Sequence, residues 1–357
     1  MKNYMVLLIV LNVFLSFSQN QNAEAQKLLT SLITKNNIVG ASAGYSINDS
    51  IIWQSAAGYA DKKSNTKFTL ETKVRIASIA KSMTALAVMQ LVEQDLIAID
   101  VPIQTYIPEY PKQGTNPITT RHLLSHTSGI SGYKDGKEAE TKINYPNLTA
   151  ALDIFKNREL KFTPGTQFHY TTYGYTVLGV IIERVSGLSF EEYMQQHIWD
   201  KAGMSHTGVE KFETTIDHRS RLYHQNRKGK TKEGKENNLS NRIPGGGMYS
   251  TLGDMLKFGN AVLNHVFVQE STLDLMREHH SLEKEANAYG FGWFLYNPKP
   301  NEGAIIGHNG EQTGACSQLV IVPSLGIVTV LLSNTSGTYK YVTPATFNLF
   351  ALAQKEK

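Results

Sequence analysis

Ser78 and Lys81 are the residues of this 357-residue chain whose types and spacing most directly suggest chemistry. They form the S-x-x-K tetrad 78–81. Residues three apart on a helix share a face, so the lysine amine would reach the serine hydroxyl. Lysine acts as a base only when burial or a cation lowers its pKa from about 10.4. The pair therefore predicts a serine nucleophile activated by a lysine, the general scheme of covalent hydrolysis.

The surroundings of this tetrad distinguish it from others with the same spacing. S-x-x-K also occurs at three other serines, namely Ser64, Ser131 and Ser281. Only Ser78 stands between a short extended stretch, 74–76, and a long apolar helix, which the periodicity predicts over 78–94. The helix would place the Ser78 hydroxyl at its positive end and bury the amine of Lys81 among apolar side chains.

A second serine motif lies near the amino terminus. The stretch 40–44, Gly-Ala-Ser-Ala-Gly, fits the G-x-S-x-G nucleophile elbow around Ser42. An elbow must open a helix, whereas here a turn at 48–50 and another strand follow. We therefore interpret these small residues as allowing close strand packing. The alternative is an α/β-hydrolase, in which Ser42→Ala abolishes activity and Ser78→Ala does not.

Two further motifs follow Ser78, Tyr170-Thr171-Thr172 and His308-Asn309-Gly310. In this order and at these separations, the motifs resemble those of the serine β-lactamase and penicillin-binding-protein superfamily. The resemblance is to its class C-like branch of carboxypeptidases, esterases and lactamase-related serine hydrolases. It covers about residues 25–350 and extends through three more stretches, 75–77, 121–129 and 245–254.

The resemblance implies a covalent acyl transfer. Ser78 would attack a carbonyl carbon, and Lys81 and the Tyr170 phenolate would share the roles of base and acid. The backbone N–H groups of Ser78 and Glu311 would form the oxyanion hole.

The chain departs from the superfamily pattern in two motifs. Thr172 replaces the usual asparagine of the second motif, so a hydroxyl and a methyl group stand where an amide is expected. This change is similar to the Tyr-Ser-Thr motif of the mitochondrial lactamase-like serine protease branch. His308 replaces a lysine, and an unperturbed histidine is mostly neutral at neutral pH. We expect His308 in the cleft wall, orienting a substrate carboxylate or the Tyr170 hydroxyl, with Thr172 and Gly310 also binding substrate.

These departures favour a peptidase or esterase that acts on a small peptide, amide or ester. A β-lactamase or a D-alanyl-D-alanine carboxypeptidase is the alternative within the enzymes. A non-catalytic protein that binds cell-wall peptides is a further alternative. The serine, lysine and tyrosine of the motifs argue against it, while Thr172 leaves it open.

The elements that must position the motifs define an α/β (α+β) fold of the β-lactamase/transpeptidase-like type. We expect an antiparallel sheet built from both chain ends and flanked by helices. Prolines interrupt the stretch 100–284, which predicts a large, mainly helical insertion with a solvated loop at 225–238. Periodicity predicts terminal helices over 23–35 and 343–354, and strands over 41–47, 51–59, 289–296, 304–307, 317–322 and 327–333.

Residues 1–18 are typical of a secretory signal peptide. Lys2 precedes an apolar stretch, and small residues at Ser16 and Ser18 suit cleavage near Ser18. The apolar stretch is shorter than the roughly 20 residues that a membrane-spanning helix needs; an uncleaved anchor is the alternative. We expect residues 19–357 to form one secreted or periplasmic catalytic domain without a membrane span. Its α/β part comprises about 22–99 and 285–357, and its insert about 100–284.

The composition excludes several other classes of function. With 35 basic and 31 acidic side chains the net charge is +4, and no basic run alternates with aromatics, so we expect no nucleic-acid partner. The single cysteine, Cys316, excludes an intrachain disulfide and a thiolate-rich metal site. His122 and His126 lack the glutamate of an H-E-x-x-H zinc motif, and the glycines 245–247 lack the lysine of a phosphate loop. We expect neither metal nor cofactor. The oligomeric state is not predicted.

Overall fold

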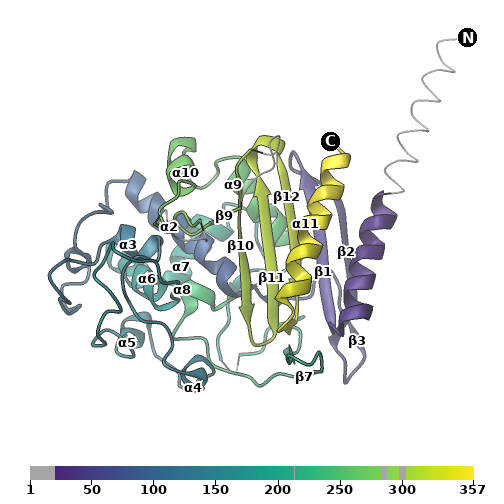
Figure 1. The fold of residues 1–357 in the computed structure, drawn as a ribbon, viewed down its shortest axis with the longest axis horizontal. Coiled ribbons are helices and arrows are strands. Elements are labelled where there is room, and N and C mark those ends of the chain that lie inside the picture. Colours follow the sequence, from purple (N-terminus) through teal and green to yellow (C-terminus); the bar gives the residue numbers. More distant parts are fainter. Residues whose placement is uncertain (1–20, 213, 283–287, 297–302) are drawn as a thin grey trace, which may run out of the picture.

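The computed structural model describes residues 21–212, 214–282, 288–296 and 303–357. A seven-stranded antiparallel sheet has the strand order β3-β2-β1-β12-β11-β10-β9 (Figure 1). The expected sheet from both chain ends is therefore confirmed. Its strands are β1 (Gly40–Ile47), β2 (Ser50–Asp61), β3 (Thr66–Lys67), β9 (Phe294–Tyr296), β10 (Ile305–Gln312), β11 (Ala315–Val322) and β12 (Ile327–Ser333).

Small residues allow β1, an interior strand of the sheet, to pack tightly. All of its residues are buried, and it pairs with β2 on one edge and β12 on the other. A Cβ on Gly44 would lie only 2.9 Å from the carbonyl oxygen of Trp53, so the close approach of β2 requires glycine there. Ser42 lies within β1, opposite Leu332 of β12. The interpretation of Ser42 as a strand residue is confirmed.

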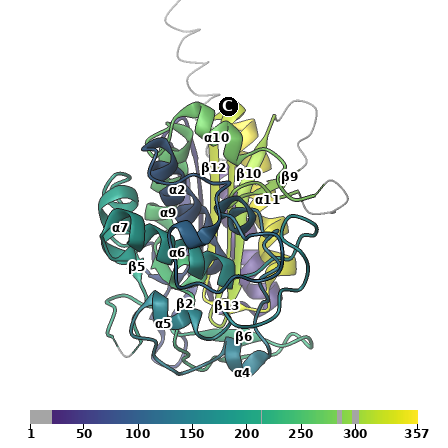
Figure 2. The ribbon, with the colours of Figure 1, turned by 90° about the vertical axis from the view of Figure 1, so that its left-hand side faces the viewer.

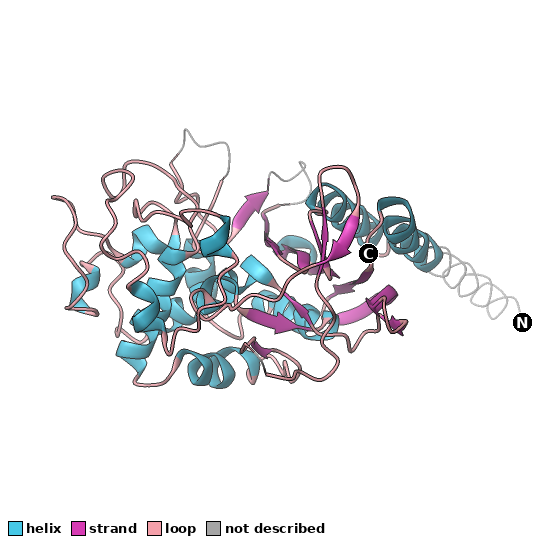
Figure 3. Ribbon diagram, turned by 90° about the horizontal axis from the view of Figure 1, so that it is seen from below, coloured by secondary structure: helices cyan, strands magenta, loops and turns pink. Residues whose placement is uncertain are grey.

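Two terminal helices cover one face of the sheet. The first spans 21–36, and α11 (Tyr339–Lys355) begins four residues before the expected start at 343. Both lie on the side away from the other helices (Figure 3). Their apolar residues share one core with β1, β11 and β12. Cys316 belongs to this core, and burial raises the pKa of its thiol to about 12.

The opposite face packs against the helical insertion, in front of the sheet in Figure 2. The mainly helical expectation is confirmed. At its centre lies α2 (Ala80–Glu93), which is buried almost throughout. The surrounding helices are α3 (Thr120–Leu124), α4 (Gly136–Ala139), α5 (Leu148–Leu152), α6 (Tyr173–Ser186), α7 (Phe190–Met194), α8 (Ile243–Gly246), α9 (Leu252–Leu263) and α10 (Glu270–Met276).

Short strands also pair outside the large sheet, and of these the sequence indicates only the extended stretch over 74–76. One small sheet joins β4 (Val74–Arg75), β8 (Met248–Ser250) and β5 (Gly208–Val209). A second joins β13 (Thr335–Ser336), β6 (Tyr223–Gln225) and β7 (Thr231–Glu233). The expectation of a solvated loop over 225–238 is therefore wrong in part. Backbone pairing forms a hairpin here without apolar alternation, and Asn237 and Asn238 are buried.

Two strand boundaries also differ from expectation. β10 extends five residues beyond Gly307, and β9 begins at Phe294 rather than at Tyr289. The expected signal peptide, residues 1–18, and its cleavage site lie outside the described residues. Within the described ranges, no helix is both long and apolar enough to cross a membrane.

Candidate active site

A sharp turn between β4 and α2 presents Ser78. The turn is the 3₁₀ element η1 (Ala77–Ile79), which leads directly into the helix. Ala77 has φ 48°, a left-handed conformation that costs a residue with a side chain roughly 1–2 kcal/mol. Ser78 is partly exposed, whereas the residues on either side are buried. The expected position of Ser78 at the start of the buried helix is confirmed.

Lys81 lies one turn further on and contacts the serine. Its Nζ is 3.0 Å from Ser78 Oγ, 2.7 Å from the carbonyl oxygen of Gly245 and 3.5 Å from Thr172 Oγ1. The side chain is fully buried. Burial, followed by the positive charge of Arg242, holds the pKa of Lys81 well below its usual value. A neutral amine beside a serine hydroxyl can accept its proton.

Tyr170 lies over the same lysine. Its ring centroid is 4.9 Å from Lys81 Nζ, and its hydroxyl is buried. Burial raises the pKa of Tyr170, and the nearby Ser78 hydroxyl lowers that pKa by less. Nevertheless, Tyr170 Oη has no partner in hydrogen-bond geometry within the described structure. The resting site therefore favours the neutral phenol over the phenolate that the resemblance implies.

His308 does not lie in an open cleft wall. It is an interior residue of β10, and its side chain is fully buried. Nδ1 lies 2.6 Å from the carbonyl oxygen of Asn309, which assigns the proton to that nitrogen, so Nε2 accepts from the Tyr289 hydroxyl at 3.0 Å. Burial and the nearby Lys81 lower the pKa of His308 to about 3. A neutral, enclosed imidazole cannot attract a substrate carboxylate by charge.

The third motif brings β10 against the nucleophile turn. A Cβ on Gly310 would lie 2.3 Å from the carbonyl oxygen of Ile76 and 3.1 Å from Ala77 Cβ, so only glycine permits this contact. Glu311 follows, with its side chain exposed and accepting from the backbone N–H of Gly337. The structure therefore brings together the peptide segments of Ser78 and Glu311, which the resemblance assigns to the oxyanion hole.

Gly245 is a site residue that the sequence reasoning missed. The three glycines 245–247 suggest only a tight turn, but residues 243–246 form the short helix α8. The carbonyl oxygen of Gly245 accepts a hydrogen bond from Lys81. A Cβ on Gly245 would lie 2.6 Å from Thr172 Cγ2. Every residue has a backbone carbonyl, so the residue type at 245 does not reveal this role. The sequence points to Gly245 only because the stretch 245–254 is part of the family resemblance.

An aromatic cluster backs Tyr170, and it too was not anticipated. The His126 ring lies 4.2 Å from that of Tyr170 and 4.9 Å from that of Tyr289, centroid to centroid. Nδ1 of His126 accepts from the backbone N–H of Thr171. His122 instead accepts at its Nδ1 from the backbone of the residue at its helix start. Within the described ranges, no group of three or more potential metal ligands occurs.

Arg75 connects the nucleophile turn to the end of β10. Its Nε donates to Glu210 at 2.9 Å, and its Nη1 donates to Asn237 Oδ1 at 2.7 Å and to the carbonyl oxygen of Thr313 at 2.9 Å. Thr313 lies in the turn between β10 and β11. Arg75 therefore fixes the strand before Ser78 to the strand that carries Glu311.

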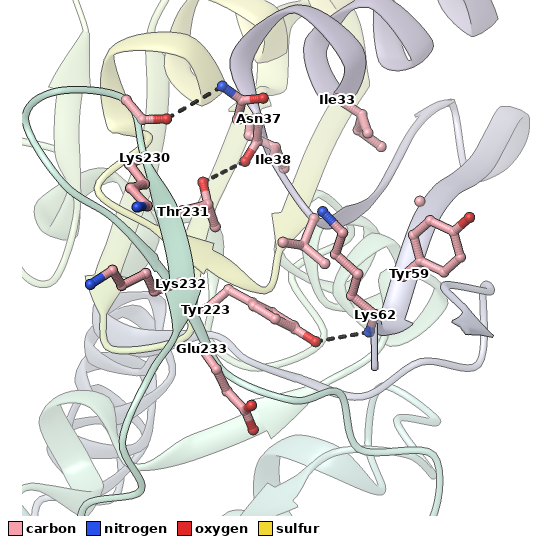
Figure 4. A pocket seen from close by; sticks show the side chains of 13 residues that line it. Ile33, Asn37, Ile38, Tyr59, Lys62, Tyr223, Lys230, Thr231, Lys232 and Glu233 are labelled. Carbon is pink, nitrogen blue, oxygen red and sulfur yellow. Dashed lines mark hydrogen bonds between the residues drawn. The ribbon is translucent and has the colours of Figure 1, made fainter. Parts of the chain in front are cut away.

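A separate pocket of about 530 Å³ lies between the helix over 21–36, the end of β2 and the β6–β7 hairpin (Figure 4). The hairpin is held to the helix end by the Thr231 hydroxyl, which donates to the carbonyl of Asn37 at 2.6 Å. Tyr223 Oη accepts from the backbone N–H of Lys62 at 2.8 Å on the other side of the pocket. None of its lining residues belongs to the Ser78 site.

A serine hydroxyl 3.0 Å from a buried lysine amine, at the start of a buried helix, is an arrangement that a serine hydrolase can use. Comparison with known proteins identifies the protein family. The family described as Beta-lactamase matches residues 25–354. The chain belongs to this family, and it is a serine hydrolase.

Relatives of known sequence agree with this assignment. The human mitochondrial serine beta-lactamase-like protein LACTB is 29% identical, over 80% of this chain and 69% of its own length. Penicillin-binding protein 4* of Bacillus subtilis is 28% identical, over 85% of this chain and 69% of its own length.

Solved structures share the fold. A penicillin-binding protein from Bacillus halodurans has a TM-score of 0.77 at 25% identity, with 90% of this chain and 99% of that chain covered. D-amino acid amidase from Ochrobactrum anthropi SV3 has a TM-score of 0.81 at 22% identity, with 94% and 100% covered. The second similarity concerns the fold alone. The β-lactamase/transpeptidase-like fold expected from the motifs is confirmed.

Proposed function

We propose that this protein hydrolyses a peptide, amide or ester bond through an acyl-enzyme on Ser78. The observation that carries the proposal is the contact between Ser78 Oγ and a fully buried lysine amine at 3.0 Å. The amine donates an N–H to the carbonyl oxygen of Gly245, and this hydrogen bond holds the nitrogen beside Ser78 Oγ. This pairing of nucleophile and base is the arrangement that covalent acyl transfer requires.

In acylation, Lys81 accepts the hydroxyl proton of Ser78 as Oγ bonds to the substrate carbonyl carbon. The negative charge that develops on the carbonyl oxygen is stabilised by the backbone N–H groups of Ser78 and Glu311. The tetrahedral intermediate collapses when its bond to the leaving group breaks. Tyr170 gives its phenolic proton to the leaving group and recovers a proton from Lys81.

In deacylation, a water molecule attacks the ester carbonyl carbon and gives a proton to Lys81. The bond between that carbon and Ser78 Oγ then breaks, and Oγ takes the proton back. These reaction steps assign the role of general base to Lys81 alone. It uses Tyr170 as a neutral acid, because the burial of its hydroxyl opposes the phenolate.

Peptidase or esterase activity is favoured over hydrolysis of β-lactams. The buried, neutral His308 supplies no positive charge for a penicillin carboxylate. Thr172 offers one hydroxyl where an asparagine would offer both a donor and an acceptor on separate atoms. We propose a small peptide, amide or ester as substrate.

Intact-protein mass spectrometry after exposure to a fluorophosphonate, and separately to a penicillin, tests the proposal. We expect one fluorophosphonate adduct in the wild type and in Ser42→Ala, and none in Ser78→Ala. A long-lived penicilloyl adduct favours a peptidase, whereas rapid release of hydrolysed penicillin favours a β-lactamase. The absence of any adduct indicates a non-catalytic binding protein, and an adduct that persists in Ser78→Ala refutes the mechanism.

We also propose that the chain is exported and that residues 1–18 are removed. The basic, apolar and small residues of this segment support the proposal. The mass of the protein recovered from a producing cell tests it. A mature chain that begins at Gln19 is expected, and a full-length chain held at a membrane supports the uncleaved anchor.

A further inference from the structure

Arg242 carries a buried positive charge close to the nucleophile. Its side chain is only 4% exposed, and its guanidinium carbon lies 4.5 Å from the ring centroid of Tyr133. Nε donates to Asn241 Oδ1 at 2.9 Å, and Nη2 donates to the carbonyl oxygen of Ala139. Both of these acceptors are neutral oxygens.

Other arginines near the site have carboxylate partners. Arg75 is paired with Glu210, and Arg158 is paired with Glu138. By contrast, none of the ion pairs among the described residues includes Arg242. A buried charge without a counterion is unfavourable, so such a charge indicates a function that needs it.

The position of Arg242 indicates which molecule supplies the counterion. Arg242 immediately precedes α8, and the carbonyl oxygen of Gly245 in α8 accepts a hydrogen bond from Lys81. Gly245 also packs against Thr172. The charge of Arg242 also acts directly on the amine of Lys81. The guanidinium therefore lies within electrostatic range of the reacting centre, on the α8 side of the site.

We propose that Arg242 binds a carboxylate on the acyl portion of the substrate, so that the preferred substrates are acidic acyl esters or amides. This inference rests on the proposed hydrolase function. Tyr170 protonates the leaving group, so the leaving group lies toward Tyr170, and the acyl portion extends toward Thr172 and Arg242. A guanidinium presents parallel N–H donors that match a carboxylate.

An effect of Arg242 on Lys81 must be separated from an effect on substrate binding. Every substrate uses the same lysine, so a change in Lys81 alters kcat/KM for all of them by the same factor. Only a direct contact changes the ratio between a charged substrate and a neutral one. That ratio is therefore the quantity to measure.

The experiment compares p-nitrophenyl hemisuccinate, which has a free carboxylate, with p-nitrophenyl butyrate, which is of similar length and neutral. For the wild type we expect kcat/KM to favour the hemisuccinate by on the order of tenfold, which corresponds to about 1.4 kcal/mol. In Arg242→Gln the ratio should fall toward one, and Arg242→Lys should retain part of it. Arg184→Gln removes the same charge from an exposed site and should keep the wild-type ratio.

A wild-type enzyme that hydrolyses both esters equally overturns the proposal, as does an Arg242→Gln enzyme that keeps the preference. If Arg242→Gln does not fold, the wild-type protein still provides a test: succinate should slow fluorophosphonate labelling of Ser78, and its neutral diamide, succinamide, should not. Equal labelling rates with the two compounds also overturn the proposal. Failure of the proposed function looks different, because then neither ester is hydrolysed and Ser78 is not labelled.

Discussion

In the proposed mechanism, the chemistry depends on the side-chain amine of Lys81. Its pKa is lowered by burial and by Arg242, so the neutral form persists at pH values where a free lysine is protonated. Because the neutral amine is the base, kcat/KM should fall when the pH drops below the lowered pKa of Lys81. Lys81→Met should reduce the acylation rate by about 10²–10⁴-fold, the usual contribution of a general base.

The pH profile of fluorophosphonate labelling checks this prediction. Removing the charge of Arg242 should move the acidic limb of the profile to higher pH, because the pKa of Lys81 then rises. Arg184→Gln, which alters an exposed ion pair, is the matched control and should leave the limb in place. A limb that is identical in Arg242→Gln and in the wild type would contradict the role of Arg242 in holding Lys81 neutral.

His308 makes the protein sensitive to acid. In the folded chain its pKa is lowered from 6.5 to about 3, whereas in the unfolded chain the imidazole titrates near 6.5. The unfolded state therefore binds the extra proton between these values, and the free energy of unfolding falls as the pH drops from 6.5 toward 3. The loss should be on the order of 1.4 kcal/mol per pH unit in this window.

Denaturant unfolding at several pH values measures that slope. His308→Gln removes the titration, so its slope between pH 6 and 4 should be shallower than that of the wild type. Other buried histidines, such as His126, keep part of the slope in both proteins. Equal slopes would show that His308 is protonated in the folded chain.

At the scale of the elements, the contact between β10 and η1 sets how closely the peptide groups of Ser78 and Glu311, the proposed oxyanion donors, approach each other. A Cβ at Gly310 would lie 2.3 Å from the carbonyl oxygen of Ile76 and 2.4 Å from Ser317 Oγ. Gly310→Ala should therefore push β10 away from η1 and slow labelling of Ser78 on the order of hundredfold, as expected for loss of an oxyanion donor. Gly253→Ala is the control, since a Cβ there meets nothing within 4 Å.

Arg75 acts on the same two elements from the opposite side of the turn. Arg75→Met leaves Glu210 buried with its contact to Arg219 but without its principal partner, so we expect a loss of about 3–5 kcal/mol of stability. Arg75→Met combined with Glu210→Met should recover much of that stability, because both buried charges are removed. Labelling of Ser78 should remain slow in the double variant, since β4 is no longer fixed to Thr313. Full recovery of labelling would show that Arg75 has no positioning role.

The elements differ in how much of them the sequence could predict. The sheet strands alternate or run apolar, and α2 carries apolar residues at helical spacing without proline or glycine, so their existence follows from periodicity. β10 was expected to end at Gly307 because His308, Asn309 and Gly310 look like a loop, yet they continue the strand. The β6–β7 hairpin contains almost no apolar residue, and pairing with β13 rather than burial forms it.

The residues of the proposed site also differ in how far the sequence alone could predict them. Ser78, Lys81 and Tyr170 belong to motifs whose order identifies them, and the structure places them together. Gly245 acts through a backbone carbonyl, and Arg242 acts through a charge whose lack of a counterion is visible only after folding. The enclosure of His308 by Tyr289 also depends on contacts between segments that are not adjacent in the sequence.

At the scale of the whole molecule, we propose that residues 19–357 unfold as one unit. Two apolar cores lie on the two faces of a single sheet, and β11 and β12 contribute to both. If one core lost its packing, β11 and β12 would be disturbed, and the other core would lose the sheet face against which it packs. Thermal unfolding of the mature chain should show one transition by far-ultraviolet circular dichroism and by tryptophan fluorescence. Two separated transitions would show that the helical insert is an independent domain.

The position of β1 in the sheet also has a consequence for biosynthesis. β1 is synthesised early, but one of its two edges pairs with β12, in the register Ala41 to Ser333. Until β12 has left the ribosome, that edge stays open and the sheet is incomplete. The peptide groups of Ser78 and Glu311 likewise meet only after β10 is made. In the proposed mechanism, a polypeptide that stops before β10 therefore lacks one of the two oxyanion donors, and hydrolysis should begin only after β10 to β12 have been translated.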